Sequence, residues 1–192
     1  MLNIKKYAAI DIGSNAMRLL IANIVEQDDK ETQFNKSSLV RVPIRLGQDA
    51  FTVGAISEEN IDRMCDAMKA FNLLMKVHKV EHYKAFATSA MREAYNGKEV
   101  TEIIKKKTGI KIEIIDGKKE AAIIASSDLH SLIKTDKTYL FVDVGGGSTE
   151  FTLFSDSKMI VSRSFKAGTV RLLNDMVHDV VWDEIEKWIR TN

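Results

Sequence analysis

The chain has 192 residues, 45% of them hydrophobic and one of them proline, so it can bury a sizeable core as a globular protein. Its formal net charge of +1 excludes a global electrostatic attraction to nucleic acid or to a membrane surface. With no apolar run near the ~20 residues of a membrane span and no signal-peptide core at the N-terminus, we expect a cytoplasmic protein whose single cysteine, Cys65, is a buried free thiol.

Apolar runs at residues 7–12 and 17–25 predict a first β-hairpin, joined by the turn Gly13-Ser14-Asn15. Residues 38–46 alternate well enough to predict a third strand, in which Pro43 favours an edge position because proline donates no hydrogen bond. Ser57 is then the expected N-cap of a long helix. Its core-facing stripe consists of residues that recur every three or four positions: Ile61, Met64, Met68, Phe71 and Met75.

Strands and helices alternate in the next part of the chain. Residues 83–87 predict a strand that runs into Thr88 and Ser89, which could cap a short helix with Arg92 near its start. A helix at 98–108 closed by Gly109, a strand at 111–115 and a helix capped by Asp116 and reaching about residue 134 follow. Residues 1–135 therefore predict an α/β lobe with a mixed five-stranded sheet.

The stretch from Asp143 to Glu150 lies between two apolar β-type runs and predicts the turn of a second hairpin. Its three glycines let a ligand approach the backbone, and successive N–H groups in such a bend form an anion site. A phosphate beside the two flanking carboxylates requires a hard cation, and Mg²⁺ is the usual one. The stretch predicts a magnesium-phosphate pocket; the alternative is a flexible hairpin with two solvated acids.

The N-terminal hairpin repeats this pattern. Residues 6–15 and 138–147 both place a tyrosine four residues before an aspartate, with apolar residues between them and Asp-apolar-Gly at the turn. Two such hairpins predict a duplicated lobe whose turns face each other across a cleft. Residues 136–192 would be the first part of the second lobe, with a third strand near 159–165, and this lobe would be truncated after one last helix. A final amphipathic helix carries apolar residues that need a cover: Val181, Trp182, Ile185, Trp188 and Ile189.

Four motifs in this order closely resemble the exopolyphosphatase and guanosine pentaphosphate phosphatase family, which belongs to the superfamily of actin, sugar kinases and heat-shock chaperones. They are the segments at 11–15, 88–94, 117–122 and 143–150. The resemblance implies a ribonuclease H-like, actin-like ATPase fold. It also implies a Mg²⁺-dependent hydrolase of phosphoanhydride bonds, a homodimer in its full-length form, whose substrate is inorganic polyphosphate or a guanosine penta- or tetraphosphate.

Phosphoanhydride hydrolysis needs a cation, donors for the developing charge and a group that activates water. The metal-side candidates are Asp11, Asp143 and Glu150. Arg92 is the cationic clamp, because a guanidinium can grip a phosphate bidentately. The remaining phosphate-binding candidates come from the turns and the capping motif: Gly13, Ser14, Asn15, Thr88, Ser89, Gly145, Gly146, Gly147, Ser148 and Thr149.

Glu120 is the candidate base, because it lies where the resembled family has its catalytic glutamate. The alternative is a first-turn acid that stabilises the helix dipole. The sequence departs from the family at Lys119, which replaces the first of two glutamates. Arg18 is a weaker candidate, since a strand arginine more often pairs with a carboxylate. Two other functions stay open: a binding module that senses polyphosphate or alarmone without turnover, and an ATP-dependent kinase of the same superfamily.

Overall fold

A computed structural model describes residues 2–28, 32–125, 137–156 and 158–192. By its internal contacts the chain divides into two units, Met1–Ile114 (unit 1) and Ile115–Asn192 (unit 2). The predicted boundary at residues 135–136 lies outside the described residues. The helix that begins at Gly117 belongs to unit 2.

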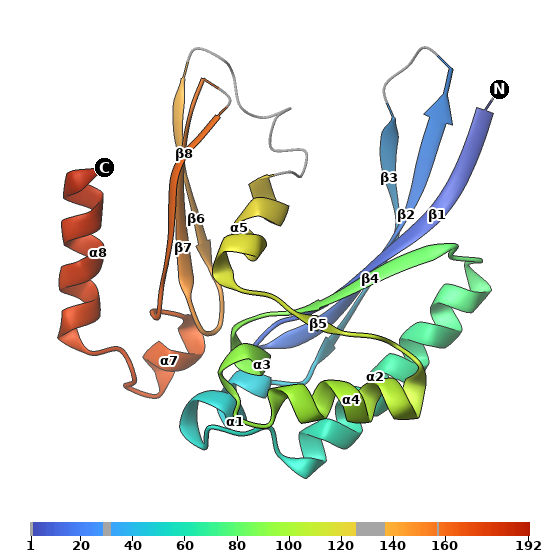
Figure 1. The fold of residues 1–192 in the computed structure, drawn as a ribbon, viewed down its shortest axis with the longest axis horizontal. Helices are drawn as coiled ribbons and strands as arrows, with labels where there is room; N and C mark the ends of the chain where they lie inside the picture. Colours follow the sequence, from blue (N-terminus) through green and yellow to red (C-terminus); the bar gives the residue numbers. More distant parts are fainter. Residues whose placement is uncertain (1, 29–31, 126–136, 157) are drawn as a thin grey trace. The chain divides into compact units, whose positions relative to one another are not determined.

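Unit 1 is built on a five-stranded sheet in the order β3-β2-β1-β4-β5 (Figure 1). β1 pairs antiparallel with β2 and parallel with β4, so the sheet is mixed, and the predicted α/β fold class is confirmed. In chain order the elements are β1 (Leu2–Ile12), β2 (Ala16–Gln27), β3 (Gln33–Pro43), α1 (Leu46–Thr52), α2 (Glu58–Val77), β4 (His82–Ala87), α3 (Ser89–Glu93), α4 (Gly97–Thr108) and β5 (Glu113–Ile114).

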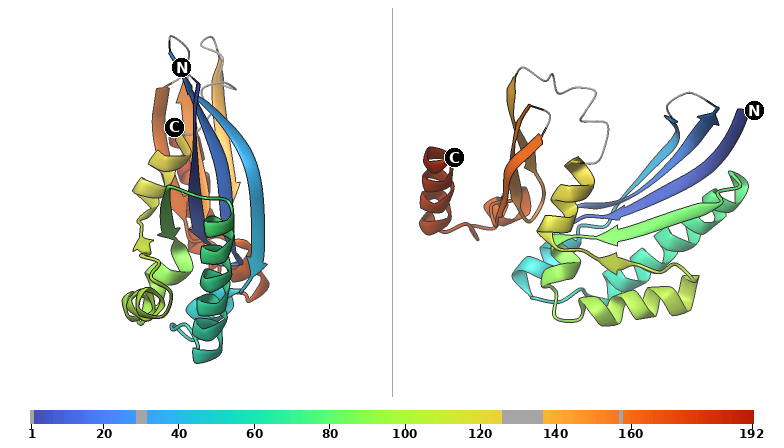
Figure 2. Two further views of the ribbon diagram at one scale, coloured as in Figure 1. Left: turned by 90° about the vertical axis from the view of Figure 1, so that its right-hand side faces the viewer. Right: turned by 45° about the horizontal axis from the view of Figure 1, so that its top comes forward.

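The core of unit 1 lies between this sheet and α2 and α4, which run side by side along one of its faces (Figures 1 and 2). Met64, Met68 and Phe71 of α2 are 0% exposed, which confirms the predicted stripe. Ser57 caps α2 by accepting a hydrogen bond from the Asn60 N–H. Cys65 is buried and free, as predicted.

The ends of the next elements follow from local chemistry. Gly109 has φ of 76° and closes α4 in the left-handed conformation that glycine adopts without strain. β5 is shorter than the strand predicted at 111–115, because only Glu113 and Ile114 pair with β4. Pro43 ends the edge strand β3, where its missing N–H costs no ladder bond.

Unit 2 contains a three-stranded antiparallel sheet in the order β6-β7-β8. Asp116 accepts a 2.7 Å hydrogen bond from the Lys119 N–H and so caps the first helix, as predicted; the continuation predicted to residue 134 lies outside the described residues. The elements are α5 (Gly117–Ala125), β6 (Thr138–Val144), β7 (Thr149–Ser155), β8 (Lys158–Phe165), α7 (Thr169–Leu173) and α8 (Asp179–Thr191).

Part of the apolar face of α8 packs against the sheet of unit 2. Ile185 and Trp188 are buried in a cluster with Phe165, and the Trp188 ring lies 6.0 Å from the ring of Phe151. Trp182 and Ile189, by contrast, are 46% and 48% exposed. The expectation that the whole face lacks a partner was therefore wrong for the two residues that contact β7 and β8. In the described part of the chain, no helix is long and apolar enough to cross a bilayer.

The two hairpins have the same register, which bears out the repeated pattern in the sequence. Asp11 lies opposite Arg18 in β1 and β2, and Asp143 lies opposite Glu150 in β6 and β7. Each turn is closed by the N–H of its first glycine: Gly13 donates to the Ala16 carbonyl at 3.1 Å and Gly145 to the Ser148 carbonyl at 2.9 Å. In both units a third antiparallel strand, a short helix and a longer helix follow. The motif is therefore duplicated in three dimensions.

Candidate functional site

The glycine turn of unit 2 is held from one side by the start of α7. The Thr169 and Val170 N–H groups donate to the carbonyls of Gly145 and Gly146, both at 2.9 Å. The Arg171 Nε–H donates to the Gly147 carbonyl at 2.8 Å. All three glycine carbonyls therefore point toward α7.

The N–H groups of the same peptide planes point the other way. In a trans peptide the C=O of one residue and the N–H of the next are antiparallel, so the N–H groups of Gly146, Gly147 and Ser148 are directed away from α7. Within the described residues none of these three N–H groups has an acceptor. Successive N–H groups without a protein acceptor in a bend are the structure that binds anionic oxygens.

Two carboxylates lie beside this turn. Asp143 and Glu150 are directly opposite in the antiparallel pair, so their side chains project from the same face of the sheet. Asp143 is exposed, whereas Glu150 is 6% exposed and accepts a 2.6 Å hydrogen bond from the Ser164 hydroxyl on β8. The Ser164 hydroxyl fixes one carboxylate oxygen of Glu150. The Asp143 carboxylate has room to reorient because it is exposed.

Helix α5 places Glu120 on this same face. A Cβ added at Gly117 would lie 3.6 Å from the Cβ of Ser164, so α5 begins against β8, whose Ser164 hydroxyl donates to Glu150. Glu120 is three residues further on and hence on the same side of the helix. Its Oε2 atom is shielded from solvent. Unit 2 thus gathers the predicted base, both of its predicted metal ligands and the glycine turn.

Thr149, predicted to bind phosphate, has a different role in the structure. Its side chain is on the opposite face of β7 from Glu150, it is 7% exposed, and its hydroxyl donates to the Ala167 carbonyl. This bond ties the end of the turn to the segment that leads into α7. Ser148 is also buried, at 8% exposed.

The turn of unit 1 is braced by the junction of β4 and α3. Ser14 and Ser89 are both buried, and their hydroxyl oxygens are 2.8 Å apart in a hydrogen bond. The Thr88 N–H donates to the Ile12 carbonyl at 3.2 Å. The helix α3 is short, as predicted, but with only five residues it places Arg92 in its last turn rather than near its start. The structure therefore brings together the unit 1 candidates at the carboxyl ends of the parallel strands β1 and β4.

Asp11 differs from its counterpart Asp143 in its partner. Arg18 Nη1 donates to Asp11 Oδ2 at 2.8 Å, so the carboxylate pair of unit 2 is replaced by an ion pair in unit 1. The alternative role given to Arg18, pairing with a carboxylate, is the one the structure has. Among the described residues no group of three or more His, Cys, Asp and Glu side chains is arranged to hold a metal. Mg²⁺ requires fewer, since it usually keeps several waters on one or two carboxylates.

Three residues that matter to this geometry were missed in the sequence: Ser164, Gly168 and Arg171. Their contacts join segments 14 to 24 residues apart, so no local pattern indicates them. One signal was present. A glycine follows the third strand in each unit, and in each case the adjoining backbone donates to the turn, as when the Gly47 N–H donates to the Ser14 carbonyl at 2.7 Å.

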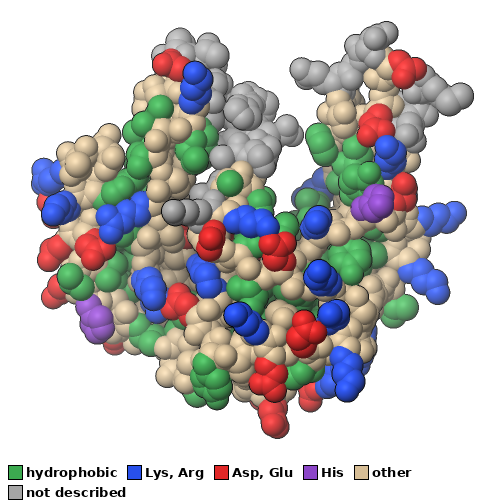
Figure 3. Space-filling model, in the orientation of Figure 1, with side chains coloured by type: hydrophobic (Ala, Val, Ile, Leu, Met, Phe, Trp, Pro, Cys, Tyr) green, Lys and Arg blue, Asp and Glu red, His purple; other side chains and the backbone are tan. Residues whose placement is uncertain are grey.

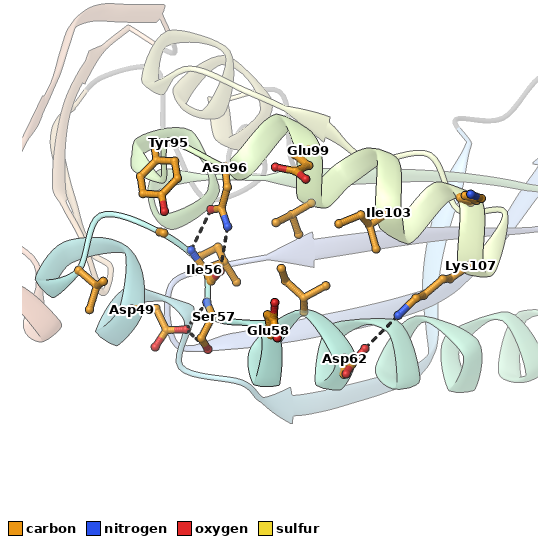
Figure 4. A pocket seen from close by; sticks show the side chains of 15 residues that line it. Asp49, Ile56, Ser57, Glu58, Asp62, Tyr95, Asn96, Glu99, Ile103 and Lys107 are labelled. Atoms are coloured by element: carbon orange, nitrogen blue, oxygen red, sulfur yellow. Dashed lines mark hydrogen bonds and ion pairs between the residues drawn. The ribbon is translucent and has the colours of Figure 1, made fainter.

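A groove of about 990 Å³ lies elsewhere in unit 1, between the start of α2 and α4 (Figure 4). Two pairs of its polar lining groups are bonded to each other: Asp49 to Ser57, and Asp62 to Lys107. None of the predicted site residues lines it. On the face in Figure 3, charged side chains of both signs are interspersed. The groove is therefore separate from the predicted site residues.

Known proteins resemble this chain over most of its length. The bifunctional 3-dehydroquinate synthase/phosphatase of Fusobacterium nucleatum is 32% identical over 96% of this chain and 30% of that protein. Exopolyphosphatase 2 of Mycobacterium tuberculosis is 30% identical over 90% of this chain and 55% of that protein. The guanosine-5'-triphosphate,3'-diphosphate pyrophosphatase of Photobacterium profundum is 29% identical over 90% of this chain and 34% of that protein. The chain thus spans between about a third and about half of these relatives.

A solved structure agrees with the sequence comparison. The crystal structure of an exopolyphosphatase from Cytophaga hutchinsonii superposes with a TM-score of 0.79 and 32% identity, over 91% of this chain and 55% of that one. The model of the Ppx/GppA phosphatase family matches residues 23–189, which include the glycine turn, Glu120 and Arg171. The chain therefore belongs to the Ppx/GppA phosphatase family.

Proposed function

We propose that this chain supplies the phosphate-binding and catalytic groups of a Mg²⁺-dependent hydrolase that removes the terminal phosphate of inorganic polyphosphate or guanosine pentaphosphate. One observation carries the proposal. The glycine turn of unit 2 directs the N–H groups of Gly146, Gly147 and Ser148 away from α7, beside the carboxylates of Asp143 and Glu150. The names of two relatives, an exopolyphosphatase and a guanosine polyphosphate pyrophosphatase, support these two substrates.

The donor set suits magnesium. Asp143 and Glu150 offer hard oxygen ligands on one face of the hairpin, and Asp143 is exposed enough to meet a hydrated ion. When bound, Mg²⁺ would polarise the phosphoryl oxygens and offset the charge between substrate and carboxylates. Asp11 is the weaker ligand, because Arg18 already neutralises it.

The remaining chemistry belongs to the chain. The backbone N–H groups of the glycine turn would hold the equatorial oxygens of the terminal phosphoryl group as charge develops on them. Glu120 would accept the proton of the water whose oxygen bonds to phosphorus while the bond to the bridging oxygen breaks. The shielding of Glu120 Oε2 from bulk solvent supports this role, because a base acts on an ordered water best where bulk water is excluded.

A second function is supported by Lys119. It lies next to Glu120, its side chain is exposed, and its positive charge favours anion binding without contributing a second carboxylate. The chain would then bind polyphosphate or alarmone without turnover. Measuring phosphate release together with binding separates the two functions, because a binding module shows saturable affinity and no release.

The test of the catalytic role is Glu120→Gln. Glutamine keeps the shape of the side chain but does not accept a proton at neutral pH, so we expect phosphate release from long-chain polyphosphate with Mg²⁺ to fall by about 10²- to 10⁴-fold. The KM should stay the same or fall, since binding groups are untouched. Glu184→Gln is the matched control in unit 2, because Glu184 is exposed and pairs only at the surface, with Arg163.

A rate for Glu120→Gln within a few-fold of the parent would rule out Glu120 as the base. A lower unfolding temperature with little kinetic change would instead indicate a helix-dipole role. Running guanosine pentaphosphate in parallel with polyphosphate distinguishes the two substrates.

The metal assignment predicts a difference between the two aspartates. Asp143→Asn should weaken binding of tripolyphosphate in the presence of MgCl₂, and EDTA should weaken binding by the parent. Asp11→Asn is the matched control and should retain most of the Mg²⁺ dependence, because its carboxylate is paired with Arg18. Titration calorimetry with and without MgCl₂ measures both. Equal affinity with and without divalent metal would contradict the assignment.

A further inference from the structure

The segment Gly168–Arg171, called the clamp below, contacts the glycine turn of unit 2 through consecutive residues. Thr169 and Val170 donate backbone N–H groups to the turn, and Arg171 donates its side-chain Nε–H. Arg171 is 8% exposed, and buried arginines are rare unless they have a specific partner. One of its partners is a backbone carbonyl of the proposed phosphate turn, that of Gly147.

Gly168 permits this contact by having no side chain. A Cβ at this position would lie 2.4 Å from the carbonyl carbon of Gly146 and 2.5 Å from that of Gly147. Real atoms do not approach so closely, so any other residue would push the clamp away from the turn. The close approach leaves the turn carbonyls facing donors on the clamp side.

We propose that Arg171 is a positioning residue of the phosphate site: its guanidinium holds the Gly147 carbonyl, and thereby orients the Ser148 N–H and its neighbours toward the phosphate. This inference rests on the proposed function of the glycine turn. Arg171 has no direct contact with phosphate in this proposal. It acts through the peptide plane that joins Gly147 to Ser148.

The physical argument concerns the freedom of glycine. Three successive glycines can rotate about φ and ψ at little steric cost, so the turn would sample orientations in which its N–H groups diverge. A charged donor bonded to a carbonyl away from water is stronger than a neutral one, so Arg171 restricts this rotation more than a neutral side chain would. Preorganised donors stabilise developing charge without having to reorient during the reaction.

Lysine is the discriminating substitution because it keeps the charge but lacks the planar Nε–H. For Arg171→Lys we expect the affinity for tripolyphosphate in MgCl₂, measured by titration calorimetry, to fall by about tenfold. The control is Arg163→Lys, on the opposite face of the sheet from Glu150, where Arg163 pairs with Glu184 at the surface. Its affinity should stay within about twofold of the parent. Equal affinities for both variants and the parent would overturn the proposal.

Amide NMR tests the positioning independently of phosphate binding. In Arg171→Lys the amide signals of Gly146, Gly147 and Ser148 should shift, while those of the corresponding unit 1 turn, residues 13–15, should not. A merely structural role would instead shift signals throughout unit 2, including those of Ile185 and Trp188 in the α8 cluster. Unchanged turn signals would overturn the proposal. Absence of tripolyphosphate binding by the parent would refute the proposed function. The amide shifts would still test whether Arg171 positions the glycine turn, because they do not depend on phosphate binding.

The parent protein offers a further measurement that does not depend on a variant folding. The Arg171 Nε–H should exchange with solvent more slowly than that of Arg190, which is exposed and pairs only with Glu186 on the surface of α8. Equal exchange rates for the two arginines would contradict the bond to the Gly147 carbonyl.

Discussion

At the scale of single residues, the two turns differ in the residue that faces the aspartate across the strand pair. Asp11 and Asp143 occupy equivalent positions in the two hairpins, yet Asp11 faces Arg18 and Asp143 faces Glu150. Opposite charges across a strand pair attract and like charges repel, so a cation or a hydrogen-bond donor nearby stabilises the unit 2 pair. Ser164 supplies one such donor. This asymmetry is the reason that we propose the cation site in unit 2.

Asp49 shows how a single carboxylate organises a helix start. Its Oδ2 accepts hydrogen bonds from the Ser57 N–H at 2.9 Å, the Ser57 hydroxyl at 2.6 Å and the Asn60 amide at 2.8 Å. Burial alone would raise the pKa of Asp49, but these bonds and the charge of Arg63 outweigh it and lower the pKa below 3.8. A depressed folded-state pKa stabilises the protein above the unfolded value, and that stability is lost as the pH falls through the folded value.

We therefore predict that Asp49→Asn lowers the free energy of unfolding at pH 7 by about 1.5–3 kcal/mol, the usual range for hydrogen bonds to a charged group. Urea denaturation at pH 7 and near pH 3 measures it, and the difference from the parent should shrink at the lower pH. Asp66→Asn is the control, because Asp66 is 77% exposed and forms a surface pair with Lys69. An equal decrease in the free energy of unfolding for the two variants would show that the hydrogen bonds of Asp49 contribute no more stability than a surface ion pair.

At the scale of elements, equivalent strands have very different surroundings. Ile10 and Ile12 of β1 are 1% and 0% exposed, because β4 pairs alongside and helices cover that face. Their counterparts in β6, Val142 and Val144, are 49% and 54% exposed. Among the described residues β6 is an edge strand with only β7 beside it. A β-strand edge with an apolar face is a surface that pairs readily with another strand.

At the scale of the whole molecule, unit 2 has an exposed apolar region on one face of its sheet. Leu140, Val142 and Val144 project from the same face of β6 as Phe151, the face that α8 covers in part, and each is about half exposed. Trp182 and Ile189 of α8 add to the exposed apolar area. Contiguous apolar surface of this kind favours self-association or binding of apolar molecules.

We predict that the purified chain enhances the fluorescence of a hydrophobic dye. We also predict that light scattering gives a mass above that of the monomer. Val142→Lys and Val144→Lys together should reduce both signals without unfolding unit 1, whose core lies elsewhere. The control is a pair of lysines at exposed sites of unit 1, Val53→Lys and Val77→Lys, where the side chains are 76% and 77% exposed. A monodisperse monomer with no dye binding would contradict the prediction.

The sequence alone determined those features that depend on local periodicity and turn chemistry. Apolar runs on either side of glycine turns predicted the two hairpins, and the spacing of Met64, Met68 and Phe71 predicted the buried face of α2. Gly109 predicted the end of α4. The repeat of Asp-apolar-Gly indicated a duplicated motif, and the register of both hairpins bears this out. These are contacts within a few residues or within one strand pair, so neighbouring side chains specify them.

Only the tertiary structure decided which residues meet across larger separations. Arg171 reaches Gly147 over 24 residues, Ser14 meets Ser89 over 75, and Ile185 and Trp188 are covered by strands that precede them. Such contacts depend on how elements pack, and packing is set by the summed shape of many side chains rather than by any short pattern. Asp11 and Asp143 occupy equivalent positions but have opposite electrostatic surroundings, because Arg18 faces one and Glu150 faces the other across its hairpin.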